Sequence, residues 1–424
     1  MSRCSIQLPG MHDIDISPIQ PVVDSPQFQR LRDVRQLGMN SRIFPSANHS
    51  RFQHSLGTYA LTFERAQRWY QEGSITEVQA NTLQLFGLLH DIGHGPYSHE
   101  SEQLCTIDHN VHGLQLLEGL ADNIRRCGGD FDLLCSLFRR VDPLYQAVSH
   151  HPLGTDKLDY IVRDSRSTNE AVSLPLGALL NYSYFRDKQL VIDGRIEYEV
   201  RHAQHAYIYM YNRIYLRKSS MIIKRLMMKM IGALMQPAEA NCLTERELWE
   251  ASDCQVDARM AAATNHTARV LYEMLQTRQL PKLALSLRPP GCGKYERIAG
   301  KPIHVCEVPW DVFSNFEASA SPREITALEQ KVAQIAKIPE EGVLIIPTTS
   351  RERFKLPDIP VYENETHITT LRRMFPKHYM SLSEQAQAHI AIRVCVPEEY
   401  RHRLKDVRLS RSIMNEIIFL YKRA

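Results

Sequence analysis

Two histidines and two aspartates have the types and the setting of metal ligands. His90 and Asp91 are adjacent and lie just before a glycine, so a helix that ends there can turn both side chains toward one ion. His54 and Asp156 complete a set of two imidazoles and two carboxylates. This mixture suits a divalent transition metal and leaves ligand positions for water or a phosphate oxygen. We therefore predict a site for Mn, Fe, Co, Ni or Zn at these four residues.

The segment after the His-Asp pair is expected to be a tight loop. Gly93, Gly95 and Pro96 disfavour continuation of a helix. The loop carries His94 and His99. An imidazole whose pKa is near neutral can donate a proton to a leaving alkoxide. These two histidines are therefore candidates for proton transfer beside the metal.

Helical patterns dominate the first two thirds of the chain. One begins at Asp24 or Ser25 as the capping residue, with Pro26 at a first helical position. In others, apolar residues recur at three- and four-residue spacing. The predicted helices span residues 24–35, 58–70, 77–91, 113–126, 131–138, 156–165 and 207–235.

The pattern changes after about residue 285. Apolar runs at residues 343–347 and 390–396 are typical of strands. We therefore predict a mainly α fold with a helical core over residues 1–284. A smaller α+β C-terminal lobe is predicted over residues 285–424.

The composition is that of a globular protein. With 424 residues and 43% hydrophobic content, the chain can bury a large core. We see no apolar run of the ~18 residues that a membrane span needs and no signal-peptide region, so we expect a cytoplasmic protein without a membrane partner. Nine cysteines without a Cys-x-x-Cys pair indicate free thiols. The net charge of +3 leaves nucleic-acid binding open, and an anionic ligand needs a local cluster of cations.

Several motifs, in one order, resemble those of the HD-domain deoxynucleoside triphosphate triphosphohydrolases. The resemblance runs from about residue 24 to residue 231. It is densest at Pro26-Gln-Phe-Gln-Arg-Leu-Arg32, Gln36-Leu-Gly38, Phe44-Pro-Ser-Ala47, Arg51-Phe-Gln-His-Ser-Leu-Gly57 and His90-Asp-Ile-Gly-His-Gly-Pro-Tyr-Ser-His99. It implies an HD-type helical core whose catalytic metal is bound by His54, His90, Asp91 and Asp156. It also implies hydrolysis of a deoxynucleoside triphosphate to deoxynucleoside and tripolyphosphate, with Mg²⁺ as a possible companion of the substrate phosphates.

The resemblance also implies catalytic roles. It puts His94, His99, Glu102 and His109 around the scissile bond. In the family a carboxylate holds a histidine, and Glu102 stands where relatives have an aspartate. That contact must therefore accommodate an additional methylene.

Substrate-binding residues are implied in the same way. Phosphate-binding cations are expected at four positions, where an arginine fork or a lysine charge suits a triphosphate: Arg51, Lys157, Arg213 and Arg217. Tyr160 and Asp164 are expected to hold the sugar 3'-hydroxyl, and Gln36 and Leu37 to pack against the deoxyribose. An apolar Leu37 would disfavour a 2'-hydroxyl. This chain departs from the family at Met221, where relatives place a tyrosine against the sugar, and at Arg217, where they place a histidine.

Regulation and assembly are implied less completely. Asp24 and Arg32 match positions that bind an activating nucleotide in the family, so a nucleotide effector is a possible partner. The Lys and Asn of that effector pocket have no clear match near the N-terminus. The family generally assembles, which implies a homo-oligomer.

Structural roles compete with several of these assignments. His94 can simply order the glycine loop, and Glu102 can be a solvated helix residue. Asp108 and His112 lie beside His109 and can take its place in the family motif. Lys157 can pair with nearby aspartates on its own helix. Arg217 begins a Met-rich stretch whose basic residues also fit an amphipathic face.

Two other functions stay open. The same metal site can hydrolyse another phosphate ester, as a nucleotide monophosphatase, a phosphodiesterase or a single-strand nuclease, because a fold does not fix a substrate. A non-catalytic nucleotide sensor is the third possibility, and it predicts binding without turnover.

Overall fold

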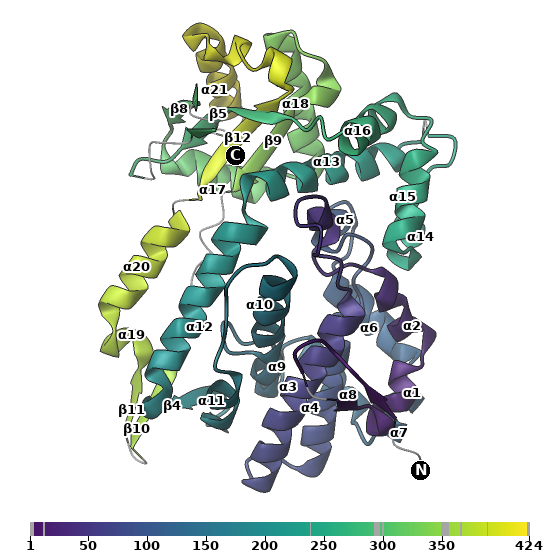
Figure 1. Ribbon diagram of the computed structural model, residues 1–424, viewed down its shortest axis with the longest axis vertical. Helices are drawn as coiled ribbons and strands as arrows, with labels where there is room; N and C mark the ends of the chain where they lie inside the picture. The colour runs from purple at the N-terminus through teal and green to yellow at the C-terminus, as the bar shows by residue number, and fades with distance from the viewer. Residues whose placement is uncertain are drawn as a thin grey trace. The chain divides into compact units, whose positions relative to one another are not determined.

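The computed structural model describes residues 4–11, 13–237, 239–291, 297–298, 301–348, 356–364, 367–387 and 389–421. Helices predominate, and the strands form small sheets (Figure 1). The predicted fold class, mainly helical with strands in the C-terminal region, is confirmed. In the described part of the chain, no helix is both long enough and apolar enough to cross a membrane.

The chain divides into two compact units. The first comprises Met1–Met210, Trp249–Asp253 and Leu356–Ser381, and the second comprises Tyr211–Leu248, Cys254–Lys355 and Leu382–Ala424. The border between the two units does not fall between residues 284 and 285, where the sequence predicted a domain boundary. That division into domains stays a prediction.

Three helices of the first unit frame the predicted metal ligands: α3 (Arg51–Gln71), α4 (Glu77–Leu89) and α10 (Thr155–Ser167). Both α4 and α10 pack on α3 (Figure 1). His54 therefore lies in the first turn of α3, Asp156 in the first turn of α10, and His90 directly after α4.

Local capping explains where α3 and α4 begin. The backbone N–H of Ser50 donates to Gln53 Oε1 at 3.0 Å, and Thr76 Oγ1 accepts from the backbone N–H of Gln79 at 3.2 Å. A Ser or Thr followed three residues later by Gln is a known helix-start pattern. The start predicted at residue 58 was therefore too late, because α3 already begins at Arg51.

Further helices complete the first unit. Their bounds are α1 (Gln20–Val23), α2 (Pro26–Gln29), α5 (His99–Glu102), α6 (His109–Glu118), α7 (Ala121–Arg126), α8 (Phe131–Phe138), α9 (Gln146–Ser149), α11 (Leu176–Asn181), α12 (Glu197–Met210) and α19 (Leu371–Met374). The helix predicted at residues 131–138 is confirmed with the same bounds. The one predicted at 113–126 is two helices, α6 and α7. The first predicted helix is the short α2, capped by Ser25 and followed by a 3-10 turn.

A small sheet explains why residues 356–381 belong to the first unit. Its strands run in the order β11 (His367–Thr370), β10 (Pro360–Asn364), β4 (Gln189–Asp193) and β3 (Ser183–Arg186). β10 pairs in parallel with β4, where Val361 faces Ile192. A second, two-stranded sheet joins β1 (Ser5–Ile6) to β2 (Ile14–Asp15).

The long helix predicted at residues 207–235 is wrong as a single element. The chain forms α12, a π-helical turn at Tyr211–Tyr215 and then α13 (Lys218–Leu234). No glycine or proline marks this break, so the apolar pattern runs through it.

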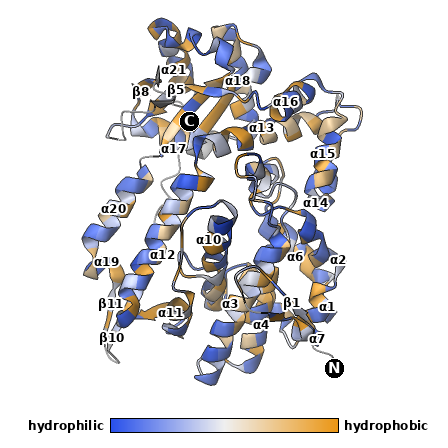
Figure 2. Cartoon of the chain, in the orientation of Figure 1, coloured by the Kyte–Doolittle hydropathy of each residue, from blue (hydrophilic) through white to orange (hydrophobic). Residues whose placement is uncertain are grey.

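The second unit is built on a four-stranded sheet in the order β8 (His304–Glu307), β5 (Lys282–Arg288), β12 (Ala391–Val396) and β9 (Leu344–Thr348). The strands predicted at 343–347 and 390–396 are thus confirmed as β9 and β12, and Figure 2 shows their apolar colouring. Buried residues of three helices share the core of this sheet: α17 (Trp310–Ser319), α18 (Pro322–Ala336) and α21 (Val407–Tyr421).

An ion cluster lies buried in the second unit. Glu329 of α18 accepts from Arg225 Nε at 2.8 Å and from the backbone N–H of Ile345 at 2.8 Å. Lys229 Nζ lies 3.3 Å from the same carboxylate. The cluster joins α13, α18 and β9 within this unit.

Candidate active site

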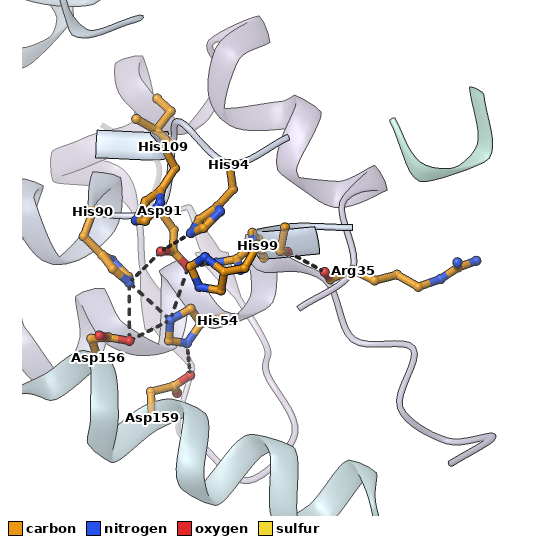
Figure 3. Close-up of polar contacts among 12 residues, drawn as sticks. Arg35, His54, His90, Asp91, His94, His99, His109, Asp156 and Asp159 are labelled. Atoms are coloured by element: carbon orange, nitrogen blue, oxygen red, sulfur yellow. Dashed lines mark hydrogen bonds and ion pairs between the residues drawn. The ribbon is translucent and has the colours of Figure 1, made fainter. Parts of the chain in front are cut away.

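The predicted metal ligands converge between α3, α4 and α10 (Figure 3). His54 Nε2 lies 3.2 Å from His90 Nε2 and 3.3 Å from Asp156 Oδ1. The Asp91 carboxylate lies 3.5 Å from His90 Nε2 and 3.6 Å from His54 Nε2. His54, His90 and Asp156 are close enough together to hold one metal ion.

Both imidazoles are held through Nδ1. His90 Nδ1 lies 2.9 Å from the carbonyl oxygen of Gly87, which can only accept, so this nitrogen carries the proton. His54 Nδ1 lies 2.8 Å from Asp159 Oδ2. When neutral, each ring therefore presents the lone pair of Nε2, and these lone pairs converge with the Asp156 carboxylate. Such a donor set fits a borderline divalent metal ion.

Neighbouring charges keep the acidic residues ionised. Burial raises the pKa of Asp91, but the Arg51 guanidinium together with His90 and His94 outweighs burial and holds that pKa well below its usual range. Burial likewise opposes ionisation of Asp156, whereas Lys157 and the histidines hold its pKa well below the usual value. Both carboxylates are therefore charged at neutral pH, as metal ligation requires.

His54 behaves differently because it has several acidic partners. Burial lowers its pKa, but hydrogen bonds with Asp156 and Asp159 outweigh burial and raise the pKa to about 9. Binding of a metal at Nε2 must therefore displace a proton from this ring.

A second group of polar residues lies next to the first. His94 Nε2 lies 3.4 Å from Asp91 Oδ1, and His94 is buried. Glu102 accepts from Nδ1 of His99 and from Nδ1 of His109, each at 3.0 Å. The structure thus brings together the four residues predicted to be catalytic. Their ligand atoms are also close enough together to hold an ion.

The ionisation of this second group is set by its contacts. Burial raises the pKa of Glu102, but hydrogen bonds from His109 and His99 outweigh it and hold that pKa well below the usual range. Burial, with Arg51, lowers the pKa of His94 well below its usual value. Glu102 is therefore an anion at neutral pH, and His94 is a neutral ring.

The loop predicted after the His-Asp pair is held in a strained shape. A Cβ on Gly93 would lie 2.0 Å from the carbonyl oxygen of His109, so glycine lets the two segments approach. Tyr97 and Ser98 both have positive φ, 56° and 58°, which costs energy for residues other than glycine. Asp253 stabilises the loop, because Oδ1 accepts from the Tyr97 backbone N–H at 2.9 Å and its carbonyl from Tyr97 Oη at 3.0 Å.

Two predicted phosphate-binding cations lie at the site but pair with its acids. Arg51 is buried, donates from Nε to Ser98 Oγ at 2.9 Å and forms an ion pair with Asp91. Lys157 Nζ lies 2.5 Å from Asp156 Oδ2. The ion pair expected to compete with phosphate binding by Lys157 is therefore formed with the adjacent Asp156.

The residues predicted to hold the sugar lie in the same unit. The Tyr160 ring centroid is 6.4 Å from that of His54. Asp164 is buried, and its Oδ1 lies 2.7 Å from His49 Nε2. Leu37 is buried, and the backbone N–H of its neighbour Gln36 donates to the carbonyl of His49 at 3.0 Å. Their roles toward a sugar stay predictions.

Other predicted binding residues lie elsewhere along the chain. Arg213 is in the π-helical turn of the second unit, and Arg217 is the N-cap of α13. Asp24 and Arg32 have local partners: Gln20 Nε2 donates to Asp24 Oδ2 at 3.1 Å, and Arg32 Nε donates to a nearby glutamine at 2.7 Å. Their roles toward phosphate or an effector stay predictions.

The sequence prediction missed three residues that hold the site. Asp159 binds His54, His49 binds Asp164, and Asp253 binds the loop. Asp159 could have been found from its spacing, because it lies one helical turn after Asp156. His49 and Asp159 also line a cavity of about 700 Å³ beside α3 and α10.

Comparison with known proteins identifies the domain that carries these residues. The HD domain family model matches residues 51–171, so the chain contains an HD domain. An uncharacterized protein of Methanocaldococcus jannaschii is 32% identical over 222 residues, which are 50% of this chain and 46% of that protein. The deoxynucleoside triphosphate triphosphohydrolase SAMHD1 homolog of Dictyostelium discoideum is 28% identical over 221 residues, 47% of this chain and 43% of the relative. The resemblance that the motifs indicated is confirmed.

The curated relatives are only partly covered. The matched part spans about half the length of the archaeal, viral and Dictyostelium relatives and 12–20% of the length of the vertebrate ones. Among solved structures, a phosphohydrolase of Bacteroides thetaiotaomicron aligns with a TM-score of 0.70 at 21% identity, over 93% of this chain and 100% of that chain. This structural likeness concerns the fold alone.

Proposed function

Because residues 51–171 form an HD domain, we propose that this chain is a metal-dependent phosphohydrolase that converts a deoxynucleoside triphosphate to deoxynucleoside and tripolyphosphate. One observation carries the proposal: the ligand atoms of His54, His90 and Asp156 converge beside the Glu102–histidine group. A site that offers both metal ligands and a held proton donor has the parts that hydrolysis of a phosphate ester needs.

His54, His90, Asp91 and Asp156 would hold the divalent ion, which is Mn, Fe, Co, Ni or Zn in this proposal. When bound, the ion supplies Lewis-acid polarisation of a phosphoryl oxygen. His99 supplies the proton for the leaving group, and Glu102 supplies the negative charge that stabilises the protonated His99.

His99 is the proton donor in this proposal. Glu102 accepts from His99 Nδ1, so Nε2 is the ring nitrogen left for the substrate. The His99 side chain is 63% exposed, which gives a leaving group access to it. Water attacks the α-phosphorus and loses a proton to solvent, the bond to the 5'-oxygen breaks, and that oxygen leaves with a proton from His99, which solvent then reprotonates. The anionic Glu102 stabilises the imidazolium before the transfer.

The deoxynucleotide substrate is supported by two observations. Relatives that carry a triphosphohydrolase name match this chain. Leu37 and Tyr160 are in the same unit as the metal ligands, where an apolar side chain and a phenol suit a deoxyribose. A nucleotide effector and a homo-oligomer belong to the same proposal.

The test is an identification of products. The full chain is incubated with each deoxynucleoside triphosphate in Mn²⁺ or Mg²⁺, and products are separated by chromatography and phosphorus NMR. We expect deoxynucleoside plus tripolyphosphate, loss of turnover in His90→Gln, and retention of turnover in His202→Gln, whose Nε2 lies 2.8 Å from the carbonyl oxygen of Ser173. Monophosphate plus pyrophosphate would indicate a phosphodiesterase-type reaction, and binding without turnover would indicate a sensor. Either result overturns the proposal.

A further inference from the structure

Asp159 lies behind His54, on the side of the ring away from the other ligands (Figure 3). His54 Nδ1 and Asp159 Oδ2 are 2.8 Å apart, and both residues are buried. A carboxylate on the far nitrogen of a metal-binding histidine fixes which nitrogen faces the metal and how the ring is turned.

Arg163 holds Asp159 in place. It lies one helical turn further along α10, donates from Nε to Oδ2 at 2.9 Å and from Nη2 to Oδ1 at 2.7 Å. Two parallel hydrogen bonds restrict a carboxylate in position and in rotation. Arg163 is buried as well, with 8% of the residue exposed.

Gly57 gives the pair room to reach His54. It lies in α3 one turn after His54, and a Cβ there would meet Asp159 Oδ1 at 2.0 Å and Arg163 Nη2 at 2.2 Å. Glycine inside a helix costs about 1 kcal/mol relative to alanine. Alanine would therefore favour the helix itself, but it would displace the ion pair.

We propose that Gly57, Asp159 and Arg163 act together as positioning residues for His54, and that they set the affinity of this centre for its divalent ion. The inference rests on the metal site of the proposed function. None of the three touches the ion in this proposal. They act through the direction and electron density of the His54 ring.

The test measures metal binding without turnover. The full chain, freed of metal, is titrated with Mn²⁺, and the sharp electron paramagnetic resonance spectrum of the free ion reports what stays unbound. We expect Asp159→Asn and Gly57→Ala each to weaken Mn²⁺ binding by about 10- to 100-fold. Arg163→Lys keeps the charge but not the two parallel bonds, so it should weaken binding by a smaller factor.

A double variant separates positioning from general packing. The double variant Gly57→Ala with Asp159→Asn should bind Mn²⁺ about as weakly as Asp159→Asn alone. Each change disrupts the same contact, the one between Asp159 and His54, so their effects should not add. Gly342→Ala is the matched control: its Cβ would meet Pro397 Cγ at 2.6 Å in the second unit. It should change the melting temperature without changing Mn²⁺ affinity.

Two outcomes overturn different statements. If the wild-type chain binds Mn²⁺ and folded Asp159→Asn and Gly57→Ala bind it equally well, the positioning role is wrong although the metal site stands. If the wild-type chain binds no divalent ion, the metal site fails, and the positioning role fails with it. Circular dichroism of each variant at the titration temperature establishes that it is folded.

Discussion

The ring of His94 stacks on the ring of His109, with centroids 3.9 Å apart and planes inclined by 12°. Two imidazolium ions in this arrangement would repel each other. Burial and Arg51 keep His94 neutral, and Glu102 accepts from His109. Of the two stacked rings, only that of His109 can therefore carry a positive charge, and it lies next to the Glu102 carboxylate.

Glu102→Gln should lower kcat. The change removes the charge that stabilises a protonated His99, and general acid catalysis contributes roughly 10²- to 10⁴-fold. We expect a loss of kcat of about 10²-fold with little change in Mn²⁺ affinity, measured by steady-state kinetics and metal titration. Glu100→Gln in the same short helix serves as the control and should retain activity. An unchanged kcat in Glu102→Gln would exclude the role given to this carboxylate.

Leu37→Ala should relax the choice of sugar. Leu37 is only 9% exposed, and a smaller residue leaves space that a 2'-hydroxyl can use. The ratio of kcat/KM for deoxynucleotide over ribonucleotide should fall by about tenfold, since a methylene-scale change of fit is worth 1–3 kcal/mol. Met39→Ala, at another buried position, should leave the ratio unchanged. If both variants have the wild-type ratio, Leu37 does not select the sugar.

Acid should weaken the fold through His150. Burial lowers the pKa of His150 to about 3, below its ordinary value of 6.5. The unfolded chain therefore binds a proton more readily than the folded chain between these values, and stability falls as the pH drops through 6.5 toward 3. Because His150 is half-buried and not fully enclosed, solvent screening reduces the effect, and we expect a loss of about 1 kcal/mol between pH 7 and pH 5.

His150→Gln should reduce that loss, as measured by urea denaturation at both pH values. His266→Gln is the control, because its side chain is 72% exposed. An acid sensitivity of His150→Gln equal to that of the wild type would show that other groups are responsible.

Glu329→Ala should destabilise the second unit. The change leaves Arg225 and Lys229 buried without their shared carboxylate. Breaking such a cluster costs about 3–5 kcal/mol. Hydrogen exchange of the β9 amides measures the loss, and Glu416→Ala, which removes a more exposed partner of Lys331, should cost less than about 1 kcal/mol. Equal protection of β9 in both variants would contradict this role for Glu329.

The parts of the fold that were predictable have local signals. Phe131–Phe138 lies between turn residues and has apolar residues at helical spacing, and β9 and β12 are short apolar runs. The break between α12 and α13 has no such signal. A π-helical turn changes the hydrogen-bond register without requiring a particular residue, so the pattern predicted one continuous helix.

The residues of the candidate site also divide into those with a local sequence signal and those without one. His54, His90, Asp91 and Asp156 were predicted from residue type and context, and the structure brings them together. Asp253 could not be predicted, because it reaches the loop from a position 156 residues after Tyr97. Long-range contacts of a lone aspartate leave no trace in spacing or composition.

The contact between Asp253 and Tyr97 has a consequence for how this chain can be divided. A fragment that ends at the boundary of the matched HD domain, residues 51–171, keeps the ligands of α3, α4 and α10 but loses the residue that holds the strained loop. Excising the domain along its family boundary should therefore yield folded helices with a relaxed His94–His99 segment. The smallest fragment that keeps this loop in place is therefore discontinuous in sequence, and gene fusions or circular permutations must carry Trp249–Asp253 with it.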